Sequence, residues 1–116
     1  MFNQNNRLRK TKEIEKTFKN GKSFYNDILG FKVLKNDLQE SRFCVIISAK
    51  VSKKAAERNK IKRRIRSIIL GKITEIKKGF DVIVIVNKNI INLDFSRLEE
   101  EICFSFKKIG IYDKHF

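Results

Sequence analysis

The chain contains the stretch Lys50-Val51-Ser52-Lys53-Lys54-Ala55-Ala56-Glu57-Arg58-Asn59-Lys60-Ile61-Lys62-Arg63-Arg64-Ile65-Arg66. It holds nine lysines and arginines and one acid, so it carries a net charge of +8 out of +14 for the whole chain. Apolar residues recur at i, i+4, i+7 and i+8, namely Ile61, Ile65, Ile68 and Ile69. This spacing predicts a helix that packs on the rest of the protein by one stripe and is cationic elsewhere.

The stacked like charges favour a polyanionic partner for this helix. A solvated surface helix with an accidental charge excess is the alternative. Such helices usually mix signs, because a glutamate four residues before a lysine supports the helix whereas like charges repel. The sequence pI of about 10.0 points the same way, to nucleic acid or an anionic membrane surface.

The composition predicts one globular domain over residues 1–116, since 41% of the residues are hydrophobic. No apolar run approaches the roughly 20 residues of a membrane span. The first residues lack the apolar region of a signal peptide, so we expect a cytoplasmic protein. We therefore expect Cys44 and Cys103 to be buried thiols rather than metal ligands, and His115 to have no catalytic role.

The chain outside the basic stretch alternates helical and strand patterns. Residues 1–10 are polar and basic and predict a mobile arm. A helix is expected over residues 11–20 with Thr11 as its cap, and strands over residues 23–26, 29–35, 42–48 and 80–86. Ser52 is a candidate cap for the basic helix and Gly71 for its end. A last helix is expected after Asp94, with a stripe of Phe95, Leu98, Ile102, Phe106 and Ile109.

These elements predict an α/β (α+β) two-layer sandwich in the order α-β-β-β-α-β-α. Residues 36–41 have the polar composition of a hairpin loop. The strands at residues 42–48 and 80–86 read as apolar on both faces and flank one helix, so they should be parallel. Physical principles alone favour a right-handed crossover between them, as in about 98% of cases.

The segment Arg58-Asn59-Lys60-Ile61-Lys62-Arg63 resembles the signature helix of the bacterial ribonuclease P protein subunit, which reads Arg-Asn-Arg-hydrophobic-Lys-Arg. The preceding strand and short basic turn, and the segment Asn6-Arg7-Leu8, are similar too. Lys60 stands where the family has an arginine, and Val51 where it commonly has a lysine. The resemblance implies a mixed four-stranded sheet with a left-handed crossover, which we expect here in place of the usual right-handed one.

The resemblance also implies a function. In ribonuclease P the RNA subunit carries the active site with Mg²⁺, and the holoenzyme hydrolyses a phosphodiester to remove the 5′ leader of precursor tRNA. The protein is then expected to bind the catalytic RNA and the leader, as a monomer with one RNA, and to involve neither DNA nor membrane. The RNA-binding residues expected are Lys50, Lys53, Lys54, Arg58, Asn59, Lys60, Lys62, Arg63 and Arg66.

The leader is expected in a cleft between the first helix and the sheet. Ile14 and Phe18 lie four residues apart on one helical face and either belong to the core or border this cleft. Lys32, on the second strand, could pair with a phosphate. We expect the Mg²⁺ to be bound mainly by the RNA subunit and the substrate.

The chain by itself lacks the patterns of a nuclease. No acidic pair has the spacing and apolar setting of a metal site, and there is no Ser-His or Cys-His arrangement and no glycine-rich phosphate loop. We therefore expect no catalytic residue and no metal ligand in the protein.

Three other functions are compatible with the sequence. One is a free-standing RNA-binding or ribosome-associated protein. A DNA-binding helix module is another, although its recognition helix would normally follow a helix and here follows a strand. A membrane-surface helix is the third, although the apolar stripe is needed to cover the sheet.

Overall fold

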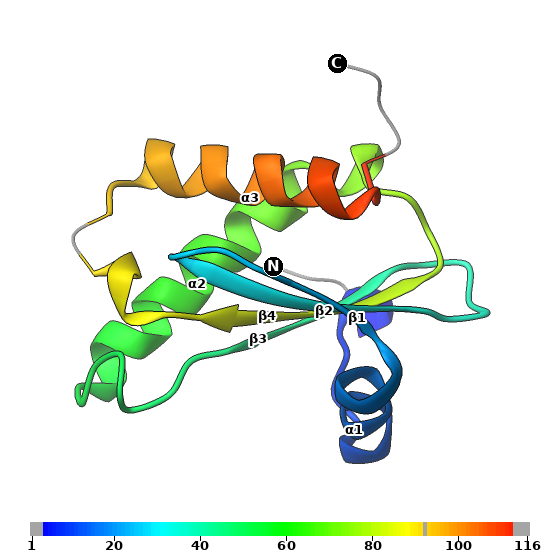
Figure 1. The fold of residues 1–116 in the computed structure, drawn as a ribbon, viewed down its shortest axis with the longest axis horizontal. Coiled ribbons are helices and arrows are strands. Elements are labelled where there is room, and N and C mark those ends of the chain that lie inside the picture. The colour runs from blue at the N-terminus through cyan, green and yellow to red at the C-terminus, as the bar shows by residue number, and fades with distance from the viewer. Residues whose placement is uncertain (1–3, 92, 113–116) are drawn as a thin grey trace.

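The computed structural model describes residues 4–91 and 93–112, and its elements confirm the order expected from the sequence (Figure 1). The helices and strands are α1 (Thr11–Asn20), β1 (Lys22–Tyr25), β2 (Leu29–Lys35), β3 (Arg42–Ile46), α2 (Ala55–Gly71), β4 (Phe80–Val86) and α3 (Phe95–Ile109). Short 3-10 turns at Gln4–Asn6, Ile73–Glu75 and Lys88–Ile90 connect some of them. The α+β class is therefore confirmed.

The four strands form one mixed sheet in the order β1-β2-β4-β3. β1 pairs with β2 and β2 with β4 in antiparallel fashion, whereas β3 and β4 are parallel, as the β-α-β pattern predicts. The expectation of a hairpin at residues 36–41 is wrong. β4 lies between β2 and β3 because its apolar residues need cover on both faces, so the loop crosses the end of β4. The left hand of the β3-α2-β4 crossover stays a prediction from the resemblance.

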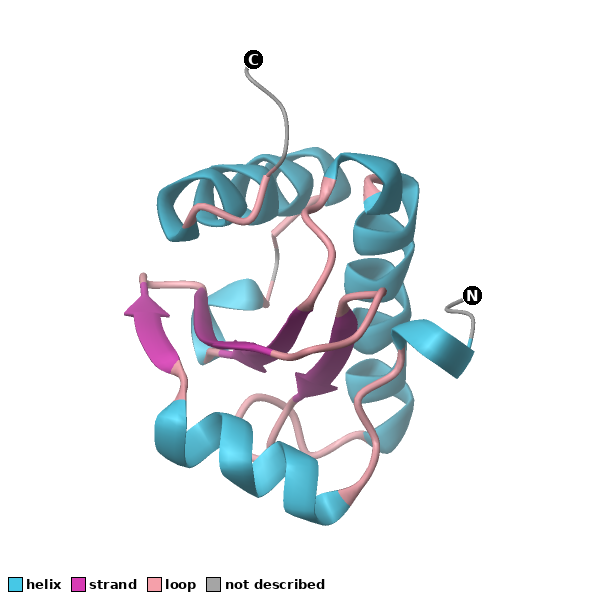
Figure 2. Ribbon diagram, turned by 90° about the vertical axis from the view of Figure 1, so that its right-hand side faces the viewer, coloured by secondary structure: helices cyan, strands magenta, loops and turns pink. Residues whose placement is uncertain are grey.

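The helices lie on both sides of this sheet. α3 covers one face, α2 packs beside it along β3, and α1 crosses the opposite face (Figures 1 and 2). The core between the sheet and α3 is aromatic at its centre, where the ring centroids of Phe31 and Phe106 are 5.9 Å apart. Both residues are fully buried. One face of the sheet is thus a closed core, while the other has only one short helix on it.

The isoleucine stripe of α2 is buried as predicted. The relative exposure of Ile61 is 7%, that of Ile68 is 3%, and Ile65 and Ile69 are fully inaccessible. All four belong to the hydrophobic core formed with the sheet and α3. Burying one such side chain contributes roughly 1.5–3 kcal/mol, so the stripe is the main attachment of this helix.

The helix ends differ from the predicted caps in three places. Thr11 is the first residue of α1 and not its cap, which is Lys10. Ser52 lies two residues before the cap of α2, and its Oγ accepts a hydrogen bond from the N–H of Lys54 at 3.2 Å. A serine hydroxyl can accept a hydrogen bond from a backbone N–H in such a turn as well as at the start of a helix. Gly71 belongs to α2 and does not follow it.

The predicted cap of α3 is confirmed, since the carboxylate of Asp94 accepts a hydrogen bond from the N–H of Arg97 at 2.8 Å. Gly110 ends this helix with a φ of 88°, a left-handed conformation that glycine adopts without strain. Contrary to the prediction, neither cysteine is fully buried. Both are free thiols with intermediate exposure, because Cys103 packs at the margin of the core and Cys44 lies on the opposite face of the sheet.

The amino-terminal segment is not the mobile arm that the sequence predicts, at least over the residues that can be described. The side chain of Leu8 is 2% exposed, and its N–H donates to the carbonyl of Phe43 at 3.0 Å. The buried Asn6 donates from Nδ2 to the carbonyl of Ser41 at 2.9 Å. Residues 1–3 lie outside the described part. The segment is therefore fixed along the free edge of β3.

Within residues 4–91 and 93–112, no helix combines the length and apolar character that a membrane crossing requires.

The isoleucine stripe can be tested by truncation at its centre. Ile65→Ala should lower the free energy of unfolding by about 2–5 kcal/mol, because it leaves a cavity, and Ile65→Val by about 0.5–1.5 kcal/mol. Urea unfolding followed by circular dichroism measures both. A loss below about 1 kcal/mol for the alanine variant would contradict the assignment of Ile65 to the attachment of α2.

Candidate nucleic-acid interface

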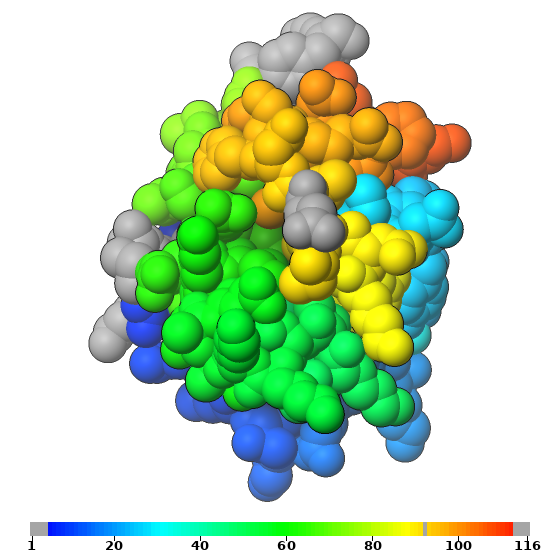
Figure 3. Space-filling view, turned by 90° about the vertical axis from the view of Figure 1, so that its left-hand side faces the viewer, coloured from blue at the N-terminus to red at the C-terminus, as the bar shows by residue number. Residues whose placement is uncertain are grey.

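The residues expected to bind RNA all lie at the surface of α2 and the loop before it. Lys50, Lys53, Lys54, Asn59, Lys60 and Arg63 are exposed, whereas Arg58, Lys62 and Arg66 are half-buried. Figure 3 shows the loop and the first turns of α2, in green, as one continuous outer surface. Among the described residues, no carboxylate lies within ion-pair distance of these cations. Their charge is therefore available to an external anion.

Arg58 differs from the other cations, because its guanidinium is engaged by the protein itself. Its Nη1 donates to the carbonyl of Ser52 at 2.8 Å. This bond holds the basic loop, with Lys53 and Lys54, against the first turn of α2. The sequence did not predict this contact. Arg58 thus positions part of the basic surface as well as contributing charge to it.

A groove of about 510 Å³ runs between α2, β3 and the amino-terminal segment. Lys62 and Arg66, one turn apart, form one wall, and Arg7 and Arg9 lie on the other. The pairing of the segment with β3 places these two arginines there, because Arg7 forms a parallel bridge with Phe43. The groove therefore unites cations that lie more than fifty residues apart in the sequence.

A thiol also lines this groove. Burial raises the pKa of Cys44, and the nearby positive charges of Lys62 and Arg66 only partly offset that effect. The thiol therefore stays neutral near pH 7 and leaves the positive charge of the groove unreduced.

The three residues expected in the leader cleft are found on the open side of the sheet. Ile14, on α1, is half-buried and lines the groove with Cys44. Phe18, one turn further along α1, is 38% exposed. Lys32 and Cys44 flank Ile83 in one row across the sheet, so they share a face about 10 Å apart. Ile14 therefore joins the groove that the α2 cations line, whereas Phe18 and Lys32 are on the same side of the sheet but are not among the residues that line it.

An ion-pair network that the sequence did not predict holds α1 on this face. Arg42 donates from Nε and Nη2 to the two carboxylate oxygens of Asp81 at 2.8 and 2.7 Å, and from Nη1 to Glu13 of α1 at 3.0 Å. Asn36 adds a bond to Asp81 at 2.7 Å. The hydrogen bonding of its guanidinium to Asp81 contributes most to the raised pKa of Arg42. In the sequence, only the polar residues at the start of β3 pointed to such a network, and they do not indicate which residues pair.

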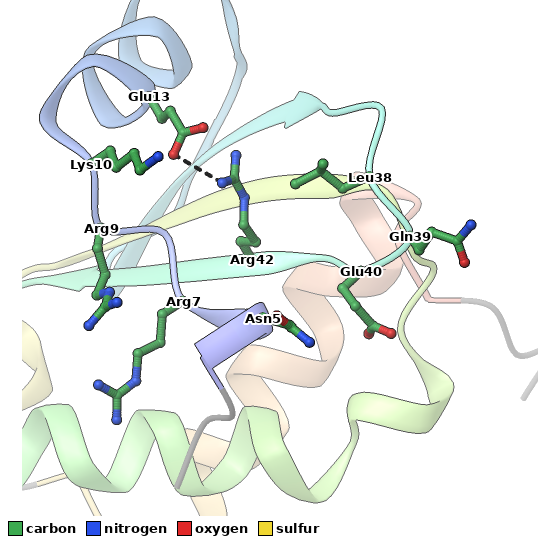
Figure 4. Close-up of a pocket in the computed structure, with 9 residues that line it drawn as sticks. All are labelled: Asn5, Arg7, Arg9, Lys10, Glu13, Leu38, Gln39, Glu40 and Arg42. Carbon is green, nitrogen blue, oxygen red and sulfur yellow. Dashed lines mark hydrogen bonds and ion pairs between the residues drawn. The ribbon is translucent and has the colours of Figure 1, made fainter.

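A second pocket, of about 420 Å³, lies beside this network (Figure 4). Arg7, Arg9 and Lys10 line it together with Arg42, whose charge is already paired. In Figure 4 the side chains of Arg7 and Arg9 extend from the amino-terminal segment toward α2. These two arginines therefore extend the cationic surface of the groove, whereas Arg42 is structural.

The described residues contain no group of three or more histidines, cysteines or carboxylates that could hold a metal ion. Two of the acids on the open side, Glu13 and Asp81, are ion-paired with Arg42. The acids in this region therefore do not fit the oxygen-rich coordination that Mg²⁺ prefers.

Comparison with known proteins gives a consistent picture. A profile of the family described as Ribonuclease P matches residues 2–110. The chain is 36% identical to the ribonuclease P protein component of Synechocystis sp. over 92% of this chain and 87% of that one. It is 35% identical to that of Clostridium botulinum strain 657, over 93% and 97%. The solved ribonuclease P protein from Thermotoga maritima superposes with a TM-score of 0.82 at 33% identity, covering 90% of this chain and 97% of that one.

The Arg42 network can be tested by removing the arginine. Arg42→Ala should lower the free energy of unfolding by about 3 kcal/mol, because it leaves the buried Asp81 unpaired. Hydrogen exchange should also become faster in α1, which loses its contact through Glu13.

Lys78→Ala is the matched control. The Nζ of Lys78 lies 3.9 Å from the Oε2 of Glu40, and the lysine side chain is 71% exposed. Such a surface pair is worth about 0–1 kcal/mol. Equal effects of the two substitutions on unfolding would exclude the Arg42 network as the attachment of α1.

Proposed function

Because the chain belongs to the ribonuclease P protein family, we propose that its cationic groove and basic helix bind the ribonuclease P RNA and the 5′ leader of precursor tRNA. The chain thereby acts in tRNA processing, as a component of an endoribonuclease holoenzyme. The observation that carries this proposal is the groove in which Lys62 and Arg66 face Arg7 and Arg9 beside an open, partly apolar sheet face. A cationic wall suits phosphates, and the apolar face suits unpaired bases.

The protein's contribution is electrostatic and steric. Catalytic RNA and substrate are both polyanions, and closely spaced fixed cations lower the repulsion between them. The exposed residues Lys60 and Arg63 contact phosphates of the large RNA, as do the basic residues of the preceding loop. Asn59 is exposed, and its side-chain amide offers both a hydrogen-bond donor and an acceptor. It therefore fixes the orientation of a contact, which charge alone does not.

The single-stranded leader passes along the open face of the sheet, beside α1. Phe18 supplies an exposed aromatic surface there and Lys32 a cation, while Ile14 forms part of the apolar floor. Neither kind of contact reads the edges of the bases. Binding is then largely tolerant of leader sequence and depends steeply on salt.

In this proposal the RNA subunit carries out the hydrolysis. Mg²⁺, bound mainly by phosphates of the RNA subunit and the substrate, supplies the chemistry when it is present. The protein binds the leader, orients it relative to the RNA and neutralises charge. We further propose one protein for each RNA and a cytoplasmic location.

Reconstitution tests the proposed function directly. The purified protein, mixed with a bacterial ribonuclease P RNA at low Mg²⁺ and moderate salt, should enable cleavage of precursor tRNA at the 5′ end of the mature sequence. Cleavage is followed on a labelled substrate, with protein alone and RNA alone as controls. A protein that binds RNA but never restores cleavage is instead a free-standing RNA-binding protein, and cleavage by the protein alone contradicts the assignment of catalysis to the RNA.

The groove cations can be tested by the salt dependence of binding. The double substitution Lys62→Ala, Arg66→Ala should weaken binding to the RNA subunit. It should also reduce the slope of log K against log salt by about 0.7–0.9 for each lost phosphate contact.

The control is Lys107→Ala with Lys108→Ala, which removes the same charge from the last turn of α3. If both pairs change the slope equally, the effect reflects net charge and the groove is not the contact surface.

A further inference from the structure

Tyr25 presents the most exposed large hydrophobic side chain among the described residues, at 56% exposure. It ends β1, and its neighbour Phe24 points into the core, with a ring centroid 6.3 Å from that of Phe31. Because successive side chains of a strand point to opposite faces, Tyr25 lies on the open face of the sheet. That is the face crossed by α1 and bordered by the cationic groove.

The ring of Tyr25 rests against Gly30, its cross-strand partner on β2. A Cβ atom at Gly30 would lie 2.5 Å from two carbons of the tyrosine ring, closer than any side chain can approach. Glycine at this position therefore lets the ring settle against the strand. Gly30 is itself buried, whereas more than half of the tyrosine surface stays open to solvent.

A cation lies over this ring. The Nζ of Lys32 lies 6.0 Å from the centroid of Tyr25, and it also donates a hydrogen bond to Ser23 Oγ. Lys32 and Gly30 are two residues apart on β2, so they share the open face with Tyr25. An exposed aromatic face with an adjacent ammonium is the arrangement that binds an unpaired nucleotide, with the base on the ring and the phosphate at the cation.

Exposure alone does not carry this argument, because the chain has a second aromatic of the same kind. Phe104, on α3, is 54% exposed, and Lys108 Nζ lies 5.8 Å from its ring centroid. α3 lies across the sheet from α1, away from the open face (Figure 2). Tyr25 differs from Phe104 in sharing a face with the residues proposed to bind the leader, and in having a glycine beneath its ring.

We propose that Tyr25, seated on Gly30, is a stacking platform for one nucleobase of the 5′ leader, with Lys32 pairing with the adjoining phosphate. This inference rests on the proposed function and adds a residue of β1 to the surface formed by α1 and β2. The platform accepts any base, since every base has a π-face. It makes one position of the leader sensitive to the presence of a base rather than to its identity.

The test compares Tyr25→Leu and Tyr25→Phe in the reconstituted holoenzyme. Leucine keeps an apolar side chain but removes the aromatic face, whereas phenylalanine keeps the face and removes the hydroxyl. The substrates are precursor tRNAs in which each leader nucleotide in turn is made abasic, and mature tRNA without a leader. Affinity of the holoenzyme for each is measured, with Phe104→Leu as the matched control.

With the unsubstituted protein, loss of one base should weaken binding by about 5- to 150-fold, the range of a base–aromatic stack. Tyr25→Leu should weaken binding of the intact precursor by a similar factor, abolish the effect of that abasic position and leave mature tRNA unaffected. The affinity of the Tyr25→Phe holoenzyme for precursor tRNA should stay within about two-fold of that of the unsubstituted protein. The affinity of the Phe104→Leu holoenzyme should do the same.

Two results overturn the inference while leaving the proposed function intact. One is an unchanged abasic profile in Tyr25→Leu. The other is an equal loss for precursor and mature tRNA. If the unsubstituted protein supports no cleavage at all, the proposed function fails, and the inference about Tyr25 fails with it.

Discussion

The packing of four isoleucines of α2 against the core is the interaction on which the rest of this structure depends. It has to overcome the repulsion of like charges along the same helix, such as Arg58, Lys62 and Arg66 at successive i, i+4 positions. Each such pair costs about 0.2–0.5 kcal/mol, whereas each buried isoleucine contributes about 1.5–3 kcal/mol. Burial therefore exceeds repulsion by several-fold, and the helix presents its cations in a fixed geometry without needing an anion to hold it together.

The second constraint is the unequal covering of the sheet. Its core face is closed by α2 and α3, but the opposite face has only α1, attached through Arg42 to Asp81 and Glu13. This attachment is polar and local, so it covers the end of the sheet near Asp81 and leaves the other end open. Tyr25 lies at the open end, paired with Gly30, and Lys32 lies midway along the same face. α1 also packs on the sheet through the fully buried Thr17, so the arginine network adds to this packing rather than replacing it.

The distribution of paired and unpaired charge separates structural residues from those available to RNA. Arg42 has its positive charge satisfied by carboxylates of the protein, whereas the cations of α2 and its loop have no carboxylate within ion-pair distance among the described residues. Arg58 lies between these classes, because it binds a backbone carbonyl and keeps its charge. Such a surface attracts polyanions, which suits a component of an endoribonuclease of tRNA processing.

The local elements and the family could be predicted from the sequence. The isoleucine spacing predicted α2, the bounds of β2 and β4 and the cap of α3 were correct, and the segment from Arg58 to Arg63 indicated ribonuclease P. The three-dimensional fold was needed to show that β4 lies between β2 and β3, that Arg7 faces Lys62, and that Tyr25 rests on Gly30. Helical and strand periodicities report which face of an element is buried, because they repeat over neighbouring residues. They carry no information on which distant element covers that face, since pairings across the chain arise only when the whole core packs.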